Sequence, residues 1–311
     1  MSTTADRLRA RLRRLFELDG HPLTEDPGAA VSQGDGPAHV AQRLVFRTAQ
    51  GAAVRGIWCR PHAPGPVPAV LVIHAHGGRY AIGADELLHG RPALHTAPGP
   101  ALAAQGIGAL CLDLPGFGER ADDRGAVWES AAAKAALWEG RSLAGQMLGE
   151  CRSALDWLAA RTDVRADRIG VFGISMGATL GYWLAAVDTR VRALAHECCL
   201  ADFRALIATG AHDLHGPYLT VPGLLRVASN GRIAGLVAPR AQFVGLGDTD
   251  PLTPPAATDP ALREVRAAYA RSGGWLVLHR EAASGHVETP AMHAAMLAFL
   301  ERALSAQGLS P

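Results

Sequence analysis

The sequence lacks several features that would assign it to a specialised class of protein. Its 311 residues include 30 Lys and Arg against 29 Asp and Glu, so neither sign of charge dominates. Binding to nucleic acids or to anionic membranes draws on an excess of positive charge, and nothing in the composition favours either partner. Lys134 is the only lysine, and together with the abundant alanine, glycine and proline this indicates a codon-composition habit rather than a function.

Long apolar runs and disulfide motifs are also missing. No apolar run approaches the about 20 residues that a transmembrane helix needs. Residues 1–18 carry arginines throughout and no continuous apolar stretch, which is not the pattern of a secretory signal. The sequence has five cysteines and no Cys-x-x-Cys pair. We therefore expect buried thiols rather than structural disulfides, and a location in a reducing cytoplasm.

What the sequence does contain is a regular alternation of strand and helix patterns from residue 38 to residue 311. Strands are expected at 40–47, 53–60, 69–73, 107–112, 167–172, 191–196, 241–246 and 275–279. Helices are expected at 99–105, 126–138, 142–160, 178–186, 201–209, 260–271 and 290–303. This order predicts a single α/β domain with a mostly parallel central sheet and helices on both faces. The first two strands form an antiparallel hairpin at a sheet edge. Three segments are candidates for a lid: 79–98, 121–141 and 212–230.

The N-terminal residues 1–37 differ from this pattern. Apolar residues recur on one face of a predicted amphipathic helix over 5–18, with arginines elsewhere. These apolar residues are Leu8, Leu12, Leu15 and Phe16. Residues 19–37 are rich in glycine, proline and aspartate and are predicted to form a loop. An exposed apolar face on the helix would dock on the main domain or on a second subunit, and it favours a homodimer or a larger homo-oligomer.

The stretch Gly-Ile-Ser-Met-Gly at 173–177 has the spacing G-x-S-x-G. A short apolar strand pattern precedes it and a helical pattern with small residues follows it. This context predicts a tight strand–turn–helix with Ser175 at its apex, where the hydroxyl stands clear of the sheet. The flanking glycines are needed because side chains there would collide with the neighbouring strand and helix.

A serine hydroxyl is a weak nucleophile unless a base, oriented by an acid, takes its proton. In open α/β sheets catalytic groups gather just beyond the carboxyl ends of strands. Asp250 and His286 each follow an expected strand, and the chain order Ser175, Asp250, His286 is that of a Ser-His-Asp triad on this kind of sheet. Pro251 turns the chain away directly after Asp250, which favours Asp250 as the acid. Asp248 is the alternative.

The tetrahedral intermediate of acyl transfer needs two backbone N–H donors for its oxyanion. One is expected from Met176, directly after the serine. The other is expected from the loop after strand 69–73, from His76 or Gly77. His74 and His76 also stand at the i, i+2 spacing of metal ligands, but no third ligand lies at a useful spacing. We therefore predict no metal and no cofactor.

Taken together these stretches resemble the α/β-hydrolase superfamily, in particular the dienelactone-hydrolase-like group and the related acetyl-xylan-esterase-like ester hydrolases. The resemblance covers roughly residues 40–304 and rests on HAHGG at 74–78, DLPGFGER at 113–120, DRIG at 167–170 leading into 173–177, GDTDPLTP at 247–254 and SGH at 284–286. It implies an α/β-hydrolase fold with Ser175 as nucleophile, Asp250 as acid and His286 as base. It also places His76 ahead of Gly77 as the second oxyanion donor. The dienelactone hydrolases proper use cysteine where this chain has serine.

The sequence thus predicts a cytoplasmic serine hydrolase that cleaves a small-molecule carboxylic ester through an acyl-enzyme. The same site could instead pass the acyl group to an alcohol or an amine, or drive elimination of an acyl group from a natural product. A non-catalytic ligand receptor on the same fold is the alternative from another class. It predicts a broken triad, whereas the sequence retains all three residues. Specificity is expected to reside in the lid segments.

Overall fold

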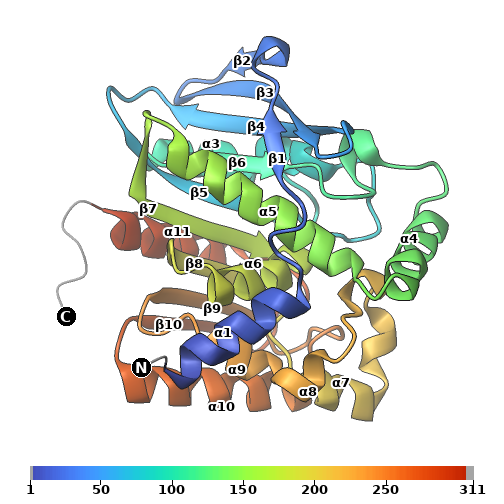
Figure 1. The fold of residues 1–311 in the computed structure, drawn as a ribbon. Coiled ribbons are helices and arrows are strands. Elements are labelled where there is room, and N and C mark those ends of the chain that lie inside the picture. The colour runs from blue at the N-terminus through green and yellow to red at the C-terminus, as the bar shows by residue number, and fades with distance from the viewer. Residues whose placement is uncertain (1–2, 306–311) are drawn as a thin grey trace.

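A single ten-stranded sheet organises the fold, which a computed structural model describes for residues 3–305 (Figure 1). Its strand order is β1-β3-β4-β6-β5-β7-β8-β9-β10, and β2 pairs with β3. The strands are β1 (Leu23–Glu25), β2 (Val31–Asp35), β3 (His39–Thr48), β4 (Ala53–Pro61), β5 (Val67–Ile73), β6 (Gly108–Leu112), β7 (Val164–Ile174), β8 (Val191–Glu197), β9 (Ala241–Gly247) and β10 (Leu276–Glu281). Neighbours from β6 across to β10 are parallel, while β1 to β4 are joined antiparallel. The predicted α/β sheet is confirmed.

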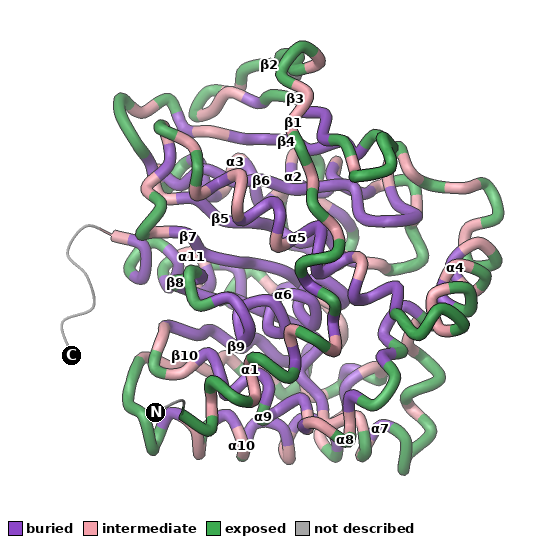
Figure 2. The backbone as a smooth tube through the Cα atoms, viewed as in Figure 1, coloured by how far each residue is buried: buried purple, intermediate pink, exposed green. Residues whose placement is uncertain are grey.

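Helices cover both faces of this sheet. They are α1 (Thr4–Leu15), α2 (Glu86–His89), α3 (Pro98–Ala104), α4 (Ala126–Trp138), α5 (Leu143–Ala160), α6 (Met176–Val187), α7 (Phe203–Thr209), α8 (Leu224–Val227), α9 (Asn230–Gly235), α10 (Pro255–Ser272) and α11 (Pro290–Leu304). Val171 of β7 belongs to the apolar core under α5 and α6, and the next residue, Phe172, belongs to the core under α3 and α11. Successive strand side chains point to opposite faces, so the central strands carry apolar residues on both faces and most of their residues are buried (Figure 2).

The N-terminal half of the sheet differs from the sequence prediction. Residues 19–37 were expected to form a loop, yet they contain β1 and β2, both of which pair with β3. The β3–β4 hairpin is confirmed, but it is not the outer edge, since β1 and β2 flank β3 and β4 pairs with β6. These two short edge strands lack an apolar alternation because they are held by backbone hydrogen bonds rather than by burial of a side-chain face.

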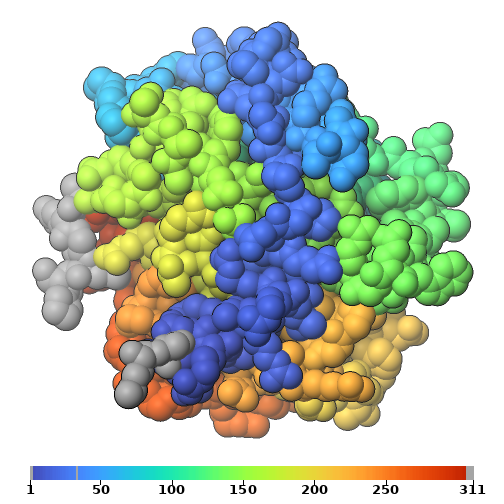
Figure 3. All heavy atoms as spheres, in the orientation of Figure 1, coloured from blue at the N-terminus to red at the C-terminus, as the bar shows by residue number. Residues whose placement is uncertain are grey.

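The amphipathic N-terminal helix is present, and it docks on its own domain. Thr3 caps α1 through a capping box with Asp6. Leu12 and Phe16 are fully buried, and the Phe16 ring stacks on Trp183 of α6 with the ring centroids 5.2 Å apart. The helix lies across one face of the molecule (Figure 3). Because its apolar face is covered within the chain, that face gives no reason to expect a dimer.

The three candidate lid segments have different positions. Residues 79–98 divide between core and surface: Ala84 and Leu87 are fully buried, and the Ala84 N–H donates to the buried Asp113 carboxylate at 2.7 Å. Tyr80 of this segment borders the cavity described below, as do the other two segments, 121–141 and 212–230. The expected domain ran to residue 311, and its residues 306–311 lie outside the described part of the chain.

The expectations for the cysteines and for membrane-spanning helices can be compared with the structure. All five cysteines are buried and unpaired, as the sequence predicted. Between residues 3 and 305, no helix has both the length and the apolar character needed to cross a bilayer.

The docking of α1 generates a stability prediction. Phe16→Ala removes a buried ring and its stacking contact with Trp183. We therefore expect the free energy of unfolding to fall by about 3 kcal/mol, which is at the lower end of the range for truncation of a buried phenylalanine to alanine. Chemical denaturation monitored by circular dichroism measures this change. Arg14→Ala, at an exposed position of the same helix, is the control and should change stability by less than about 0.5 kcal/mol. Equal stabilities of the Phe16→Ala variant and the parent would show that α1 is not held as described.

Candidate active site

Ser175 stands at the sharp turn between β7 and α6. Its backbone adopts φ 59° and ψ −121°, a region that L-residues rarely occupy. The Ser175 N–H donates to the Glu197 carbonyl of β8 at 3.0 Å, which holds the turn against the neighbouring strand. Such strain is characteristic of the turn that presents a nucleophilic serine.

The two glycines around Ser175 are required by space. A Cβ on Gly177 would collide with the Ile73 carbonyl at the end of β5, and a Cβ on Gly173 would collide with the backbone of Gly177. The collisions predicted from the sequence are therefore present. They arise because the first turn of α6 lies directly against the end of β5.

Asp250 and His286 meet at the carboxyl ends of β9 and β10. Asp250 Oδ2 lies 2.7 Å from His286 Nδ1. The carboxylate is almost fully buried and also accepts hydrogen bonds from the Thr253 hydroxyl at 2.9 Å and from the Leu252 N–H at 2.8 Å. Burial works to raise the pKa of Asp250, but the hydrogen bonds from His286 and Thr253 outweigh it and the pKa lies below its usual value. The acid is therefore held in the ionised form that orients an imidazole.

The alternative acid, Asp248, points elsewhere. Its carboxylate pairs with Arg280, which also binds Asp259 of α10 at 2.7 Å. The structure thus brings Asp250, and not Asp248, to His286. Between residues 3 and 305, no hydrogen bond joins the Ser175 hydroxyl to His286, although both side chains line the same cavity. Contacts of this kind are commonly long before a substrate is bound.

Two backbone N–H groups are available beside Ser175. Met176 is the first residue of α6, so its N–H has no acceptor within the helix. His76 lies in the loop after β5, and β5 is hydrogen-bonded to β7 in a register that pairs Ile73 with Gly173. The two expected oxyanion donors therefore lie just beyond the carboxyl ends of the adjacent strands β5 and β7.

Side chains brace the loop that carries His76. The His74 Nδ1–H donates to the Ala75 carbonyl at 3.0 Å, and His74 Nε2 accepts from the Leu114 N–H at 3.2 Å. The Ala75 N–H donates to the buried Glu86 carboxylate at 3.0 Å. His76 Nδ1 accepts from the Gly78 N–H at 2.9 Å, and its Nε2 lies 2.7 Å from Glu129. All four imidazole nitrogens considered as metal ligands are thus engaged in hydrogen bonds within the chain.

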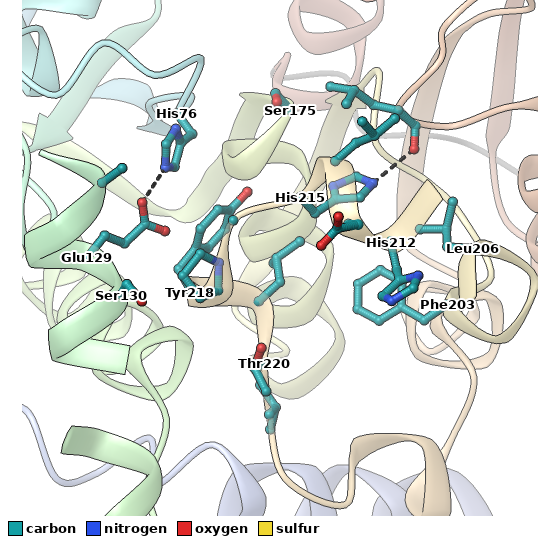
Figure 4. Close-up of a pocket in the computed structure, with 18 of the residues that line it drawn as sticks. His76, Glu129, Ser130, Ser175, Phe203, Leu206, His212, His215, Tyr218 and Thr220 are labelled. Atoms are coloured by element: carbon teal, nitrogen blue, oxygen red, sulfur yellow. Dashed lines mark hydrogen bonds and ion pairs between the residues drawn. The ribbon is translucent and has the colours of Figure 1, made fainter. Parts of the chain in front are cut away.

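A cavity of about 1140 Å³ opens at Ser175 and His286. Figure 4 shows His76, Glu129 and Ser130 on one side, Phe203 and Leu206 on the other, and Ser175 at one end. The first side comes from the loop after β5 and from α4. The second comes from the β8–β9 segment, residues 198–240, which contains α7, α8 and α9. The two lid segments 121–141 and 212–230 both border the cavity, and α4 packs against residues 217–219 of the second segment.

Two lining residues have no role in the sequence analysis above. His215 lies in the β8–β9 segment, and its Nε2–H donates to the Leu252 carbonyl at 2.9 Å. Burial lowers the pKa of His215. Glu129 is a buried carboxylate on the otherwise alanine-rich helix α4. An acidic residue on the inner side of an alanine-rich helix is a signal in the sequence, but its partner His76 lies 53 residues away along the chain.

Comparisons with known proteins give relatives at two levels. No protein-family model matches the chain. It is 38% identical over 242 residues to "Putative hydrolase YtaP" of Bacillus subtilis (strain 168), a match that covers 76% of this chain and 79% of that protein. Among solved structures, Methylesterase BT1017 superposes with a TM-score of 0.70 at 21% identity, over 98% of this chain and 66% of that one. Acetyl Xylan Esterase 1 from Thermoanaerobacterium sp. JW/SL YS485 superposes with a TM-score of 0.62 at 17% identity, over 97% and 94%.

At these identities the solved structures show a shared fold, whereas the match to the Bacillus subtilis protein is close enough and long enough to show a shared family. The strained serine turn, the order of the strands and the placement of Asp250 and His286 agree with that fold. The chain therefore has the α/β-hydrolase fold and belongs to the family of the Bacillus subtilis hydrolase.

Proposed function

We propose that this protein is a serine hydrolase that cleaves a small-molecule carboxylic ester through an acyl-enzyme. The observation that carries the proposal is the hydrogen-bonded pair of Asp250 and His286, which opens into the same cavity as Ser175 at its strained turn. Nucleophile, base and acid each follow a different strand of one sheet, which is the arrangement that activates a serine.

In the first half of the reaction, the Ser175 hydroxyl oxygen attacks the ester carbonyl carbon while His286 Nε2 takes the hydroxyl proton. Asp250, bonded to Nδ1, holds the imidazole in the tautomer with Nε2 unprotonated and stabilises the imidazolium that forms. The N–H groups of Met176 and His76 receive the negative charge that develops on the carbonyl oxygen.

In the second half, the alcohol departs and the acyl group is released. His286 gives its proton to the leaving alkoxide, so that an alcohol leaves and the acyl group remains on Ser175. A water molecule then attacks the acyl-enzyme while His286 again acts as base, and collapse of the second tetrahedral intermediate frees the acid. No step requires a metal or a cofactor.

The comparisons support this proposal, since the Bacillus subtilis relative is named as a hydrolase and the solved structures include esterases. These names favour hydrolysis over acyl transfer. A non-catalytic receptor is disfavoured because an ionised Asp250 fixed on His286 serves catalysis and not simple binding.

The proposed nucleophile can be identified by covalent labelling. We expect diisopropyl fluorophosphate to add once to the intact protein and not at all to Ser175→Ala, as measured by mass spectrometry. Turnover of p-nitrophenyl acetate and butyrate should fall in the variant by a factor on the order of 10⁴ or more, because the nucleophile is lost. Matching circular dichroism spectra serve as the folding control. An unlabelled parent protein would overturn the mechanism and favour the receptor.

The identity of the acid generates a second prediction, for which the chain provides its own control two residues away. Asp250→Asn leaves an amide that cannot hold His286 in the productive tautomer, so kcat should fall by about 10⁴-fold, as in triads of other folds. Asp248→Asn removes only a part-exposed ion pair with Arg280, so kcat should change by less than about threefold. A larger loss in Asp248→Asn than in Asp250→Asn would reverse the assignment.

A further inference from the structure

The walls of the cavity are chemically unequal. The β8–β9 segment contributes the polar side chains of His212, Asp213, His215, Tyr218 and Thr220 to the lining, but most of its lining side chains are apolar and form an apolar wall. It comprises Phe203, Leu206, Ile207, Leu214, Leu219, Val221, Leu224 and Leu225, joined by Leu252 from the loop after β9. Further polar groups lie beside Ser175, in the loop after β5 and on α4 (Figure 4).

The size of the cavity exceeds what a short acyl group needs. Sites of about 300–1,000 Å³ bury most of the surface of a drug-sized ligand, and this one measures about 1140 Å³. The apolar surface also reaches solvent at Ile207 and Leu214, which are 53% and 58% exposed. An apolar wall of this extent can bind a substrate only through apolar surface, which it removes from water.

From the apolar wall and the volume together we propose the substrate class: an ester in which one of the two groups is large and apolar and lies against the β8–β9 segment. This inference rests on the proposed function, since it takes Ser175 as the reacting group. An acetyl ester of a small polar alcohol would leave most of the wall in contact with water. Each further methylene that the wall covers should raise kcat/KM by up to about fourfold.

A chain-length series of p-nitrophenyl esters tests this class. We expect kcat/KM to rise at least about 100-fold from the acetate to the octanoate, which adds six methylenes, since the full effect per methylene would exceed that. The double variant Ile207→Ser/Leu214→Ser should lower the octanoate-to-acetate ratio of kcat/KM by about tenfold. Val31→Ser is the matched control, because Val31 is 59% exposed on β2 and is not a lining residue, and it should leave the ratio unchanged.

The outcomes separate this inference from the proposed function. If Ser175 reacts with diisopropyl fluorophosphate but kcat/KM is flat or falls beyond the acetate, the substrate class is wrong and the hydrolase stands. If the octanoate-to-acetate ratio of kcat/KM falls equally in the Val31→Ser control, the apolar wall does not recognise the acyl chain of the substrate. If Ser175 does not react, the function itself is overturned.

A separate observation concerns Glu129. Its Oε2 accepts hydrogen bonds from His76 Nε2–H at 2.7 Å and from the Tyr80 hydroxyl at 2.6 Å. Its other oxygen, Oε1, faces the backbone of the β8–β9 segment, where a Cβ on Gly216 would collide with it. The His76 ring is further enclosed by Tyr80 and Tyr218, with centroids 5.1 and 5.2 Å away. The Glu129 carboxylate of α4 thus contacts both the loop after β5 and the β8–β9 segment.

The bond to Glu129 decides which nitrogen of His76 carries the proton. A carboxylate accepts, so Nε2 must be the donor, and neutral imidazole then leaves Nδ1 free to accept. Nδ1 accepts the Gly78 N–H at 2.9 Å. That second bond closes the turn 76–78, in which Gly77 and Gly78 have φ of 52° and 66°. The same turn presents the N–H of His76 toward Ser175 in the proposed mechanism.

The geometry points to Glu129 as a positioning residue for the oxyanion site, acting through the His76 ring. It is not expected to touch the reacting atoms. Without its carboxylate the His76 ring can take the other tautomer, in which Nδ1 carries the proton and repels the Gly78 N–H. The turn 76–78 then loosens, and the backbone N–H of His76 no longer points at the substrate carbonyl oxygen on which negative charge develops. This inference also rests on the proposed function.

The test compares Glu129→Ala with Glu129→Gln and with Glu139→Ala. Loss of an oxyanion donor costs about 10²–10³-fold in kcat, so we expect Glu129→Ala to lower kcat by about 100-fold while KM changes by less than threefold. Glu129→Gln keeps an oxygen that accepts from His76 and should retain kcat within about fivefold. Glu139 ends the same helix in an exposed pair with Arg141, and Glu139→Ala should behave as the parent.

Four results would overturn the role of Glu129. Three of them are a raised KM at unchanged kcat in Glu129→Ala, an equal loss of kcat in Glu129→Gln, and an equal loss of kcat in Glu139→Ala. Each result counts only if the variant has the same thermal unfolding midpoint as the parent protein, which shows that it is folded. Parent protein that is labelled at Ser175 and turns over esters, while Glu129→Ala is unaffected, would refute the positioning role and leave the proposed function intact.

Discussion

Helix α6 begins so close to the end of β5 that nothing larger than glycine fits at Gly177, against the Ile73 carbonyl. This close approach determines the rest of the site. It forces Ser175 into its strained conformation and sets the first N–H of α6 beside the loop after β5. A turn under such strain persists only when its surroundings hold it, and here the Glu197 carbonyl of the next strand does so.

Around this fixed centre the protein builds its specificity from inserted segments. Helix α4 and the β8–β9 segment both line the cavity, and most of its apolar surface comes from the β8–β9 segment. The loop after β5 lies between them and is tied to α4 through His76 and Glu129. Substrate recognition and the geometry of the reacting site are therefore linked through one helix, although the sheet carries the proposed triad.

Much of this was predictable from the sequence, for reasons that are local. The G-x-S-x-G turn, the parallel strands and the helices around them follow from spacing and apolar periodicity. Asp250 and His286 could be named because functional groups in such sheets follow strands. The choice between Asp250 and Asp248 rested on Pro251 and on the family resemblance, and the structure adds the decisive contacts: His286 for one carboxylate and Arg280 for the other.

What the sequence by itself determined is thus the class of fold and the residues at the ends of its strands, because turn chemistry and periodicity act over a few residues. Only the tertiary structure decided that Phe16 is covered by Trp183, that Ala84 and Leu87 join the core and that Glu129 meets His76. These contacts join segments far apart along the chain. Their partners are selected by packing and by the need to pair buried charges, and neither leaves a pattern in a single stretch of sequence.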